Sequence, residues 1–190
     1  MRLVLLGPPG AGKGTQAVRL AQRLDVPAVS TGDIFRTNIA GGTPLGLTAR
    51  SYTDAGKLVP DEVTNDMVRS RLAEPDVEKG FLLDGYPRNT AQARELERML
   101  AGLGTRLDVV VEITADTDEV VARLLNRAKI EGRADDTEDV IRHRMEVYAR
   151  STAPLTEFYA ERGQLVRVDG MGTVDEVAVR LAAALPDSGS

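Results

Sequence analysis

Short apolar runs that end in glycine or polar turn residues alternate along the chain with longer segments whose apolar residues recur with helical period. Short continuous apolar runs between helical segments are typical of strands buried on both faces of a parallel sheet. The predicted strands cover residues 3–6, 28–30, 81–83, 109–113 and 165–168. The pattern therefore predicts an α/β fold in which a five-stranded parallel sheet is flanked by helices.

Helices are predicted between these runs, and several of them have recognisable first turns. Pro60 is followed by two acidic residues, and Thr173 precedes an acidic turn, which is typical of helix N-termini. The predicted helices cover residues 13–24, 33–39, 45–55, 61–73, 91–103, 117–126, 138–159 and 174–185.

Two segments interrupt the alternation of strands and helices. Residues 31–59 insert two helices between a short strand and the next helix, and residues 126–136 form a polar, glycine-containing stretch between two helices. We therefore expect one domain, with a core made of residues 1–30, 60–125 and 137–190 and two excursions that move relative to it.

Composition narrows the class of protein further. The 190 residues, of which 42% are hydrophobic and 28% charged, are typical of one globular domain. A net charge of -5 argues against general affinity for nucleic acid. The chain has no cysteine, which excludes disulfides and cysteine-ligated zinc, and it has one histidine, His143. Since no apolar run approaches the roughly 20 residues that span a bilayer, we expect a cytoplasmic protein without membrane association.

The first predicted strand leads into a glycine-rich loop, GPPGAGKGT at residues 7–15, and then into a helix. This is the arrangement of a P-loop, in which backbone N–H groups and the helix N-terminus surround a phosphate, and it predicts a P-loop NTPase-like fold. Lys13 would add a compact positive charge at the outer phosphates. Gly14 stands where the general pattern has Ser or Thr, with the hydroxyl one place later at Thr15, so direct metal ligation by the loop does not follow.

The loop alone permits a GTPase, an ATPase motor or a kinase of a small molecule. The chain has no Asn-Lys-x-Asp motif to recognise guanine, and its length leaves little room for motor machinery. A small-molecule kinase is therefore the leading class.

Two further motifs follow predicted strands. Within STGDIFR at residues 30–36, the simplest interpretation makes Thr31 a helix N-cap and Asp33 a favourable acid in the first turn. FLLDGYPR at residues 81–88 ends a strand with Asp84, at the edge where ligands bind in parallel sheets. Asp84 is placed to hold water on a Mg²⁺ ion that bridges two phosphates; the alternative is a turn-forming Asp before Gly85.

With these motifs in this order, the chain resembles the adenylate kinase family of nucleoside monophosphate kinases, in its bacterial form with a short lid. The resemblance runs over nearly the whole chain and rests on GPPGAGKGT (7–15), STGD (30–33), DAGKLV (54–59), DGYPR (84–88), GRADD (132–136) and TAPL (152–155).

The resemblance implies a donor site, an acceptor site and a set of charged residues that serve both. The residues implied in binding the ATP phosphates and base are Gly10, Ala11, Gly12, Lys13, Gly14, Thr15, Arg123, Arg127 and the backbone of Gly172. Those implied in binding AMP are Thr31, Arg36, Lys57, Leu58, Val59, Gly85, Tyr86, Pro87, Arg88, Gln92, Arg133 and Arg144, with the Tyr86–Pro87 peptide bond expected to be cis. The implied catalytic residues are Lys13, Arg88, Arg123, Arg133 and Arg144, with Asp84 binding Mg²⁺ through water.

Helical spacing agrees with part of this assignment. Arg123 and Arg127 are four residues apart on a predicted helix and can face one ligand, whereas Arg142 and Arg144 are two apart and point to different sides. Spacing does not choose between the last two; the resemblance chooses Arg144. Arg142, Arg150 and His143 are interpreted as surface residues without a role.

The activity that the resemblance implies is reversible transfer of the terminal phosphoryl group from MgATP to AMP, giving two ADP. Residues 31–59 would be the AMP-binding insertion and residues 126–136 a lid without zinc, on a monomeric enzyme. One alternative is a kinase that phosphorylates UMP or CMP. Another is an inactive nucleotide-binding regulator, which would be expected to lack the arginines that this chain has at 123, 127, 133 and 144.

Overall fold

Five parallel strands in the order β2-β3-β1-β4-β5 form the centre of the computed structural model, which describes residues 1–131 and 137–186. Val4 of the central strand lies opposite Leu83 on one side and Val110 on the other. The strands are β1 (Arg2–Leu6), β2 (Ala28–Ser30), β3 (Phe81–Asp84), β4 (Val109–Thr114) and β5 (Leu165–Asp169). The predicted fold class and all five predicted strands are confirmed.

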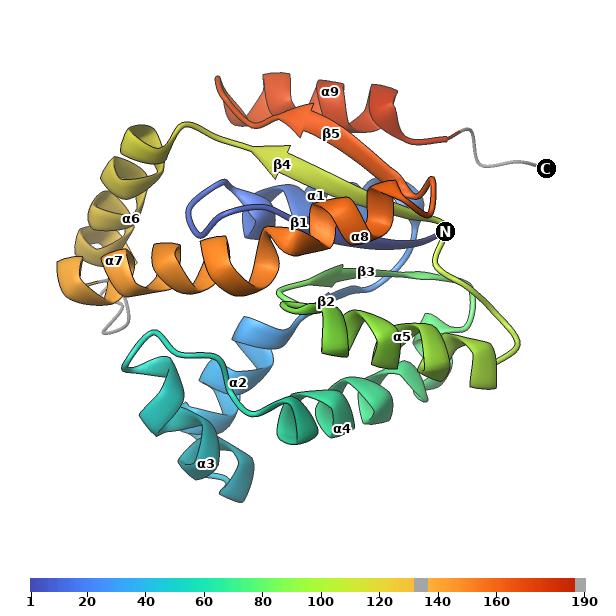
Figure 1. Ribbon diagram of the computed structural model, residues 1–190, viewed down its shortest axis with the longest axis horizontal. Helices are drawn as coiled ribbons and strands as arrows, with labels where there is room; N and C mark the ends of the chain where they lie inside the picture. The colour runs from blue at the N-terminus through green and yellow to red at the C-terminus, as the bar shows by residue number, and fades with distance from the viewer. Residues whose placement is uncertain (132–136, 187–190) are drawn as a thin grey trace.

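Helices cover both faces of the sheet, with α1 and α9 packed on one face and α4, α5 and α8 on the other (Figure 1). The helix bounds are α1 (Lys13–Leu24), α2 (Thr31–Ala40), α3 (Pro44–Thr53), α4 (Asp61–Leu72), α5 (Thr90–Gly102), α6 (Thr117–Glu131), α7 (Glu138–Val147), α8 (Pro154–Ala160) and α9 (Val174–Ala184), with a 3₁₀ turn, η1 (Pro75–Val77), and a π-helical turn, η2 (Tyr148–Thr152). In the part of the chain described, no helix is long and apolar enough to cross a membrane.

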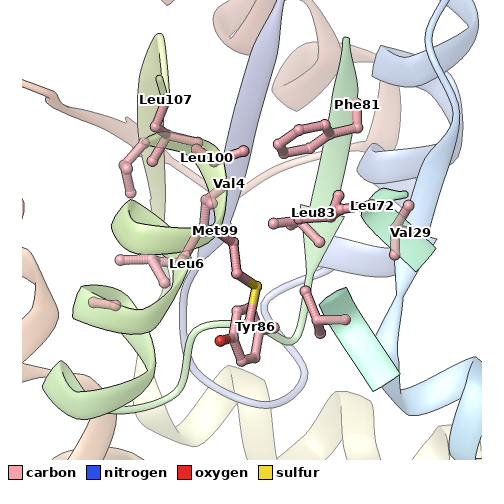
Figure 2. Packing of buried hydrophobic residues seen from close by; sticks show 14 of the residues in the cluster. Val4, Leu6, Val29, Leu72, Phe81, Leu83, Tyr86, Met99, Leu100 and Leu107 are labelled. Atoms are coloured by element: carbon pink, nitrogen blue, oxygen red, sulfur yellow. The ribbon is translucent and has the colours of Figure 1, made fainter. Parts of the chain in front are cut away.

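The core explains why the strands are continuously apolar. Alternate residues of β1 point to opposite faces, so Leu3 and Leu5 pack with α1 and α9 while Val4 and Leu6 pack with α5 and α8. Figure 2 shows the second of these layers, in which the Met99 side chain extends toward the Tyr86 ring. Each fully buried leucine stabilises the fold by roughly 1.5–3 kcal/mol, so both faces need helices over them.

The helix predicted to end at residue 126 continues to Glu131 as α6. The continuation consists of good helix formers, including Arg127, Ala128 and Lys129, and no Gly or Pro intervenes before residue 132. Residues 126–131 of the predicted polar excursion at 126–136 are therefore helical. Its other residues, 132–136, which include Arg133, lie outside the described residues.

The segment predicted as one helix over residues 138–159 is helical but is not a single regular helix, because it is divided into α7, η2 and α8. Pro154 has no N–H, and its ring clashes with the carbonyl of the residue four positions earlier, so a regular α-helix does not continue through it. The backbone widens instead, and the Ala153 N–H donates to the carbonyl of Tyr148, five residues back, at 2.9 Å.

The start of α2 also differs from its prediction. Ser30, and not Thr31, is the N-cap, since the Ser30 hydroxyl accepts a hydrogen bond from the Asp33 N–H at 3.2 Å. Thr31 is the first residue of the helix and is buried. At the other end of the chain the predicted start of α9 is confirmed, because Thr173 and Glu176 form a capping box.

Helices α2 and α3 pack closely together beside the sheet, where Phe35, Ala49 and Val59 form a small cluster of their own. Gly46 is the closest point, because a Cβ atom there would overlap the backbone of Asn38 and lie 2.6 Å from the Ile39 nitrogen. Only glycine permits this approach.

Gly46→Ala is expected to lower the free energy of unfolding by about 2 kcal/mol, since overpacking of a tight interface typically costs about 1–3 kcal/mol. Chemical denaturation measures the change, and hydrogen exchange should accelerate mainly in residues 31–53. Gly102→Ala is the control, because that glycine ends α5 in open space. Equal stability of the two variants would contradict the packing argument.

Candidate active site

Two cavities adjoin at the carboxyl ends of the strands, the edge of the sheet that faces α6, α7 and the α2–α3 insertion (Figure 1). One, of about 470 Å³, lies between the insertion and the end of β3. The other, of about 740 Å³, surrounds the glycine-rich loop. Arg36, Arg88 and Arg144 line both, so three guanidinium groups lie where the cavities meet.

The glycine-rich loop turns directly from β1 into α1. Gly10 and Gly12 have φ of 83° and 87°, a region that other residues rarely adopt. The Lys13 ammonium donates to the carbonyls of Gly7 and Pro8 at 2.8 and 2.9 Å. The loop therefore holds this cation on neutral backbone oxygens and directs the N-terminus of α1 toward the same cavity, an arrangement suited to phosphate.

Burial and mutual repulsion lower the basicity of two cations in the site. Burial lowers the pKa of Lys13 to about 8; Asp84 opposes this change, and Arg88, Arg144 and Arg127 add to it. Burial likewise lowers the pKa of Arg88 to about 10, with a further contribution from Arg144. Among the described residues, positive charge outweighs the opposing carboxylate, so an anionic ligand would relieve repulsion here.

The cavity of about 740 Å³ is lined by every residue predicted to bind ATP: Gly10, Ala11, Gly12, Lys13, Gly14, Thr15, Arg123, Arg127 and Gly172. Arg123 and Arg127 both face it, which confirms the interpretation of their helical spacing. Arg123 also pairs with Glu119 at 3.1 Å and donates to the Gly170 carbonyl at 3.4 Å. The arginine thus links α6 to the loop that precedes α9.

Two residues that the sequence analysis missed hold the same loop. The Gln16 side-chain amide donates to the Val174 carbonyl at 2.9 Å, and Arg180 donates to the Asp169 carbonyl at 3.0 Å. Gln16 could have been singled out from the sequence, because it is a polar residue on the otherwise apolar stripe of α1. The loop between β5 and α9 is therefore fixed from α1, α6 and α9.

The cavity of about 470 Å³ is lined by most of the residues predicted to bind AMP: Thr31, Arg36, Lys57, Leu58, Val59, Gly85, Arg88, Gln92 and Arg144. Tyr86 and Pro87 are placed elsewhere, although their peptide bond is cis as expected. Tyr86 is fully buried and its hydroxyl donates to the Asn65 side chain at 2.7 Å, while Pro87 lines a cavity of about 60 Å³ beside Lys13.

Gln92 belongs to a hydrogen-bonded network that reaches Arg88. Its side-chain oxygen accepts from the Arg88 N–H at 2.8 Å, and its amide donates to Asp61 at 2.8 Å. Asn89 donates to the same carboxylate at 3.0 Å. The sequence analysis interpreted Asp61 only as a first-turn acid and did not single out Asn89, because sequence distance conceals their contact with each other.

The prediction that Arg142 and Arg144 point to different sides is confirmed. Arg144 lines both cavities, whereas Arg142 is exposed and pairs with Glu138 at 2.7 Å. Arg36 pairs with Asp33 on its own helix. Arg133 lies outside the described residues.

Asp84 ends β3 and lines the larger cavity, with one carboxylate oxygen 3.8 Å from the position of a Cβ atom built on Gly14. Over residues 1–131 and 137–186, no three His, Cys, Asp or Glu side chains gather as a metal site. One carboxylate beside a phosphate loop fits Mg²⁺, which is usually bound through one or two carboxylates, several waters and substrate phosphates.

Known proteins resemble this chain over almost all of its length. A family model described as adenylate kinase matches residues 5–164. Proteins named adenylate kinase from Kocuria rhizophila, Thermobifida fusca and Stenotrophomonas maltophilia are 61%, 59% and 54% identical to it. Each alignment covers 97% of this chain, and 98%, 98% and 99% of the respective relative.

The lowered pKa of Lys13 has a measurable effect on stability. Between pH 8 and 10.5 the unfolded chain keeps a proton on Lys13 that the folded chain has lost, so the free energy of unfolding rises with pH in this window. Lys13→Met should therefore be more stable than the wild type at pH 7, by at most about 3 kcal/mol, and this advantage should shrink by pH 10. Urea denaturation at both pH values measures it. Lys79→Met, at an exposed position, should change little, and a Lys13→Met advantage that is the same at both pH values would contradict the assignment.

Proposed function

The chain belongs to the adenylate kinase family, and we propose that its larger cavity binds ATP, its smaller cavity binds AMP, and the arginines between them carry the transfer. The reaction is reversible transfer of the terminal phosphoryl group of ATP to AMP, giving two ADP. The observation that supports the placement is that Arg36, Arg88 and Arg144 line both cavities at once.

The main requirement on such a site is to stabilise negative charge. Two nucleotides bring many negative charges together, and the transferring group spreads charge over its equatorial oxygens. Lys13 would hold the outer phosphates of ATP. Arg88, Arg123 and Arg144 would stabilise the charge that develops on the transferring group, because the planar guanidinium can donate two parallel hydrogen bonds to phosphate oxygens. Removing repulsion between the reactants and aligning them accounts for catalysis without a strong general base.

The glycine-rich loop and the loop before α9 would bind opposite ends of ATP. Residues 10–15 would surround the phosphates with backbone N–H groups, and the Gly172 backbone would lie beside the adenine. Gln16 supports this assignment, since its bond to Val174 joins α1, which follows the glycine-rich loop, to the start of α9. Arg123 holds the loop before α9 from α6.

Asp84 would hold Mg²⁺ through water beside the phosphates. When bound, the ion supplies positive charge to the donor phosphates. Gly14 leaves the loop without the usual hydroxyl next to its lysine, which favours this carboxylate as the protein's contribution.

The AMP pocket would be formed by Thr31, Gln92 and the backbone of residues 57–59, with Arg36 and Arg88 on the phosphate. Closure of the insertion and of the lid at 126–136, including Arg133, would exclude water, the competing acceptor. The packing of Gly56 against α7 supports closure on the insertion side, because a Cβ atom there would lie 3.0 Å from Arg144 Cγ. Since one chain lines both cavities, we propose a monomeric enzyme.

Acceptor selectivity is tested by offering AMP, UMP, CMP and GMP separately with MgATP and measuring diphosphate formation. AMP should be preferred by about a hundredfold or more in kcat/KM, because a hydrogen-bonding pocket discriminates strongly against bases that leave its groups unpaired. A preference for UMP or CMP would favour the pyrimidine alternative. Binding of both nucleotides without turnover would favour the inactive regulator.

Lys13→Ala and Arg88→Ala should each lower turnover by about a hundredfold or more, as loss of a charge-stabilising donor typically does, while the protein stays folded. Steady-state assay and circular dichroism measure the two properties. Arg142→Ala is the matched control, because that exposed arginine pairs with Glu138 on its own helix and lines neither of the two cavities. It should keep near-normal turnover. Near-normal activity in both the Lys13 and Arg88 variants would refute the assigned roles.

A further inference from the structure

The segment at residues 152–155 has no part in the roles assigned above, yet it contains a buried polar side chain. Thr152 is 8% exposed, and its hydroxyl donates to the backbone carbonyl of Arg88 at 2.7 Å. This bond joins residues 64 positions apart in the chain. A hydroxyl placed within a protein core and bonded to a residue of the active site calls for an explanation in terms of that site.

The π-turn places this hydroxyl. Pro154 interrupts the regular hydrogen bonding of the helix, and the extra residue in the widened turn lies in Tyr148–Thr152. Single π-turns inside helices are frequent at functional sites. Here the turn ends at Thr152 and connects α8, which packs on the sheet, to α7, which carries Arg144.

Arg88 is held at three points. Its N–H donates to Gln92 at 2.8 Å, its side-chain Nε donates to the Gly85 carbonyl at 2.8 Å, and its own carbonyl accepts from Thr152. Gln92 and Gly85 are near neighbours of Arg88 in sequence and lie at the two ends of the β3–α5 connection. Of the three bonds, the one from Thr152 comes from the segment that carries Arg144.

Thr152 also lies beside three of the cations of the site. Thr152, Lys13, Arg88 and Arg144 all line the cavity of about 60 Å³. Arg88 and Arg144 are close enough that Arg144 contributes to the lowered pKa of Arg88. Because these two cations repel each other, a bond between the segments that carry them limits how far their backbones can separate.

We propose that Thr152 is a positioning residue for phosphoryl transfer: its hydroxyl, presented by the π-turn before Pro154, ties the backbone of Arg88 to the segment that carries Arg144. The inference rests on the proposed function of these two arginines. Its chemical consequence is that both guanidinium groups reach the transferring phosphoryl group in a fixed relative position. Small displacements of such groups lower the rate without abolishing binding.

Thr152→Val, which keeps the shape and removes the hydroxyl, should lower kcat by about tenfold and change the KM for ATP by less than about twofold. Thr152→Ser, which restores the hydroxyl, should recover most of the loss. Thr156→Val is the matched control, because the Thr156 hydroxyl donates to the Ala153 carbonyl at 2.9 Å at the same helical junction and the structure shows no bond from it to Arg88. It should keep wild-type kcat.

A double-mutant cycle separates positioning from a general structural role. Arg88→Ala keeps the backbone carbonyl that accepts from Thr152 but removes the guanidinium whose position relative to Arg144 the bond would set. Adding Thr152→Val to Arg88→Ala should therefore lower kcat by less than about twofold, although thermal unfolding should shift as much as in the single variant. A tenfold further loss in the Arg88→Ala background would overturn the proposal, as would wild-type kcat in Thr152→Val or failure of Thr152→Ser to recover activity.

The outcomes also distinguish this inference from the proposed function. If the wild type transfers phosphoryl groups to AMP and Arg88→Ala lowers transfer by about a hundredfold or more, the proposed function is supported whatever Thr152→Val does. Should Thr152→Val fail to fold, Thr152→Ala removes the same hydroxyl with a smaller side chain and enters the cycle in its place, with the same outcomes supporting or overturning the proposal.

Discussion

Repulsion among positive charges at the carboxyl ends of the strands is the constraint on which the site depends. Lys13 and Arg88 lose water on folding and lie near Arg144, with Asp84 as the opposing charge among the described residues. Such an arrangement lowers the stability of the folded chain and is maintained by the packing of the surrounding sheet and helices. Phosphates of two nucleotides would supply the missing negative charge. Their binding would relieve the repulsion among the cations, and this relief would contribute to the affinity for the nucleotides.

The cations fall into two groups by the partners that hold them. Lys13 and Arg88 are anchored on backbone carbonyls, of Gly7 and Pro8 in one case and of Gly85 in the other. Neutral partners orient a charge without cancelling it. These two groups can therefore remain in place while their full charge acts on a ligand.

Arg36 and Arg123 pair instead with carboxylates on their own helices, Asp33 and Glu119. Partly exposed pairs of this kind stabilise a protein by only about 0–1 kcal/mol, so a phosphate can replace the carboxylate at little cost. Arg36 lies on the insertion and Arg123 on the helix that leads to the proposed lid. Of these two arginines, Arg36 lies on a segment expected to move, whereas Arg123 lies within the predicted core at residues 60–125 and also donates to the Gly170 carbonyl.

The strands, the phosphate loop and most helix starts could be predicted from the residues alone, because these depend on periodicity, on glycine's backbone freedom and on capping residues close together in the chain. The side chains that hold the site together could be found only from the folded chain. Asp61 reaches Gln92 across 31 positions, Thr152 reaches Arg88 across 64 and Gln16 reaches Val174 across 158. The π-turn is associated with Pro154, which the sequence shows, but the contact that Thr152 of this turn makes with Arg88 in the β3–α5 connection is seen only in the folded chain. Contacts at such separations are set by how the crossover helices return to the sheet, and no local pattern of residues specifies that packing.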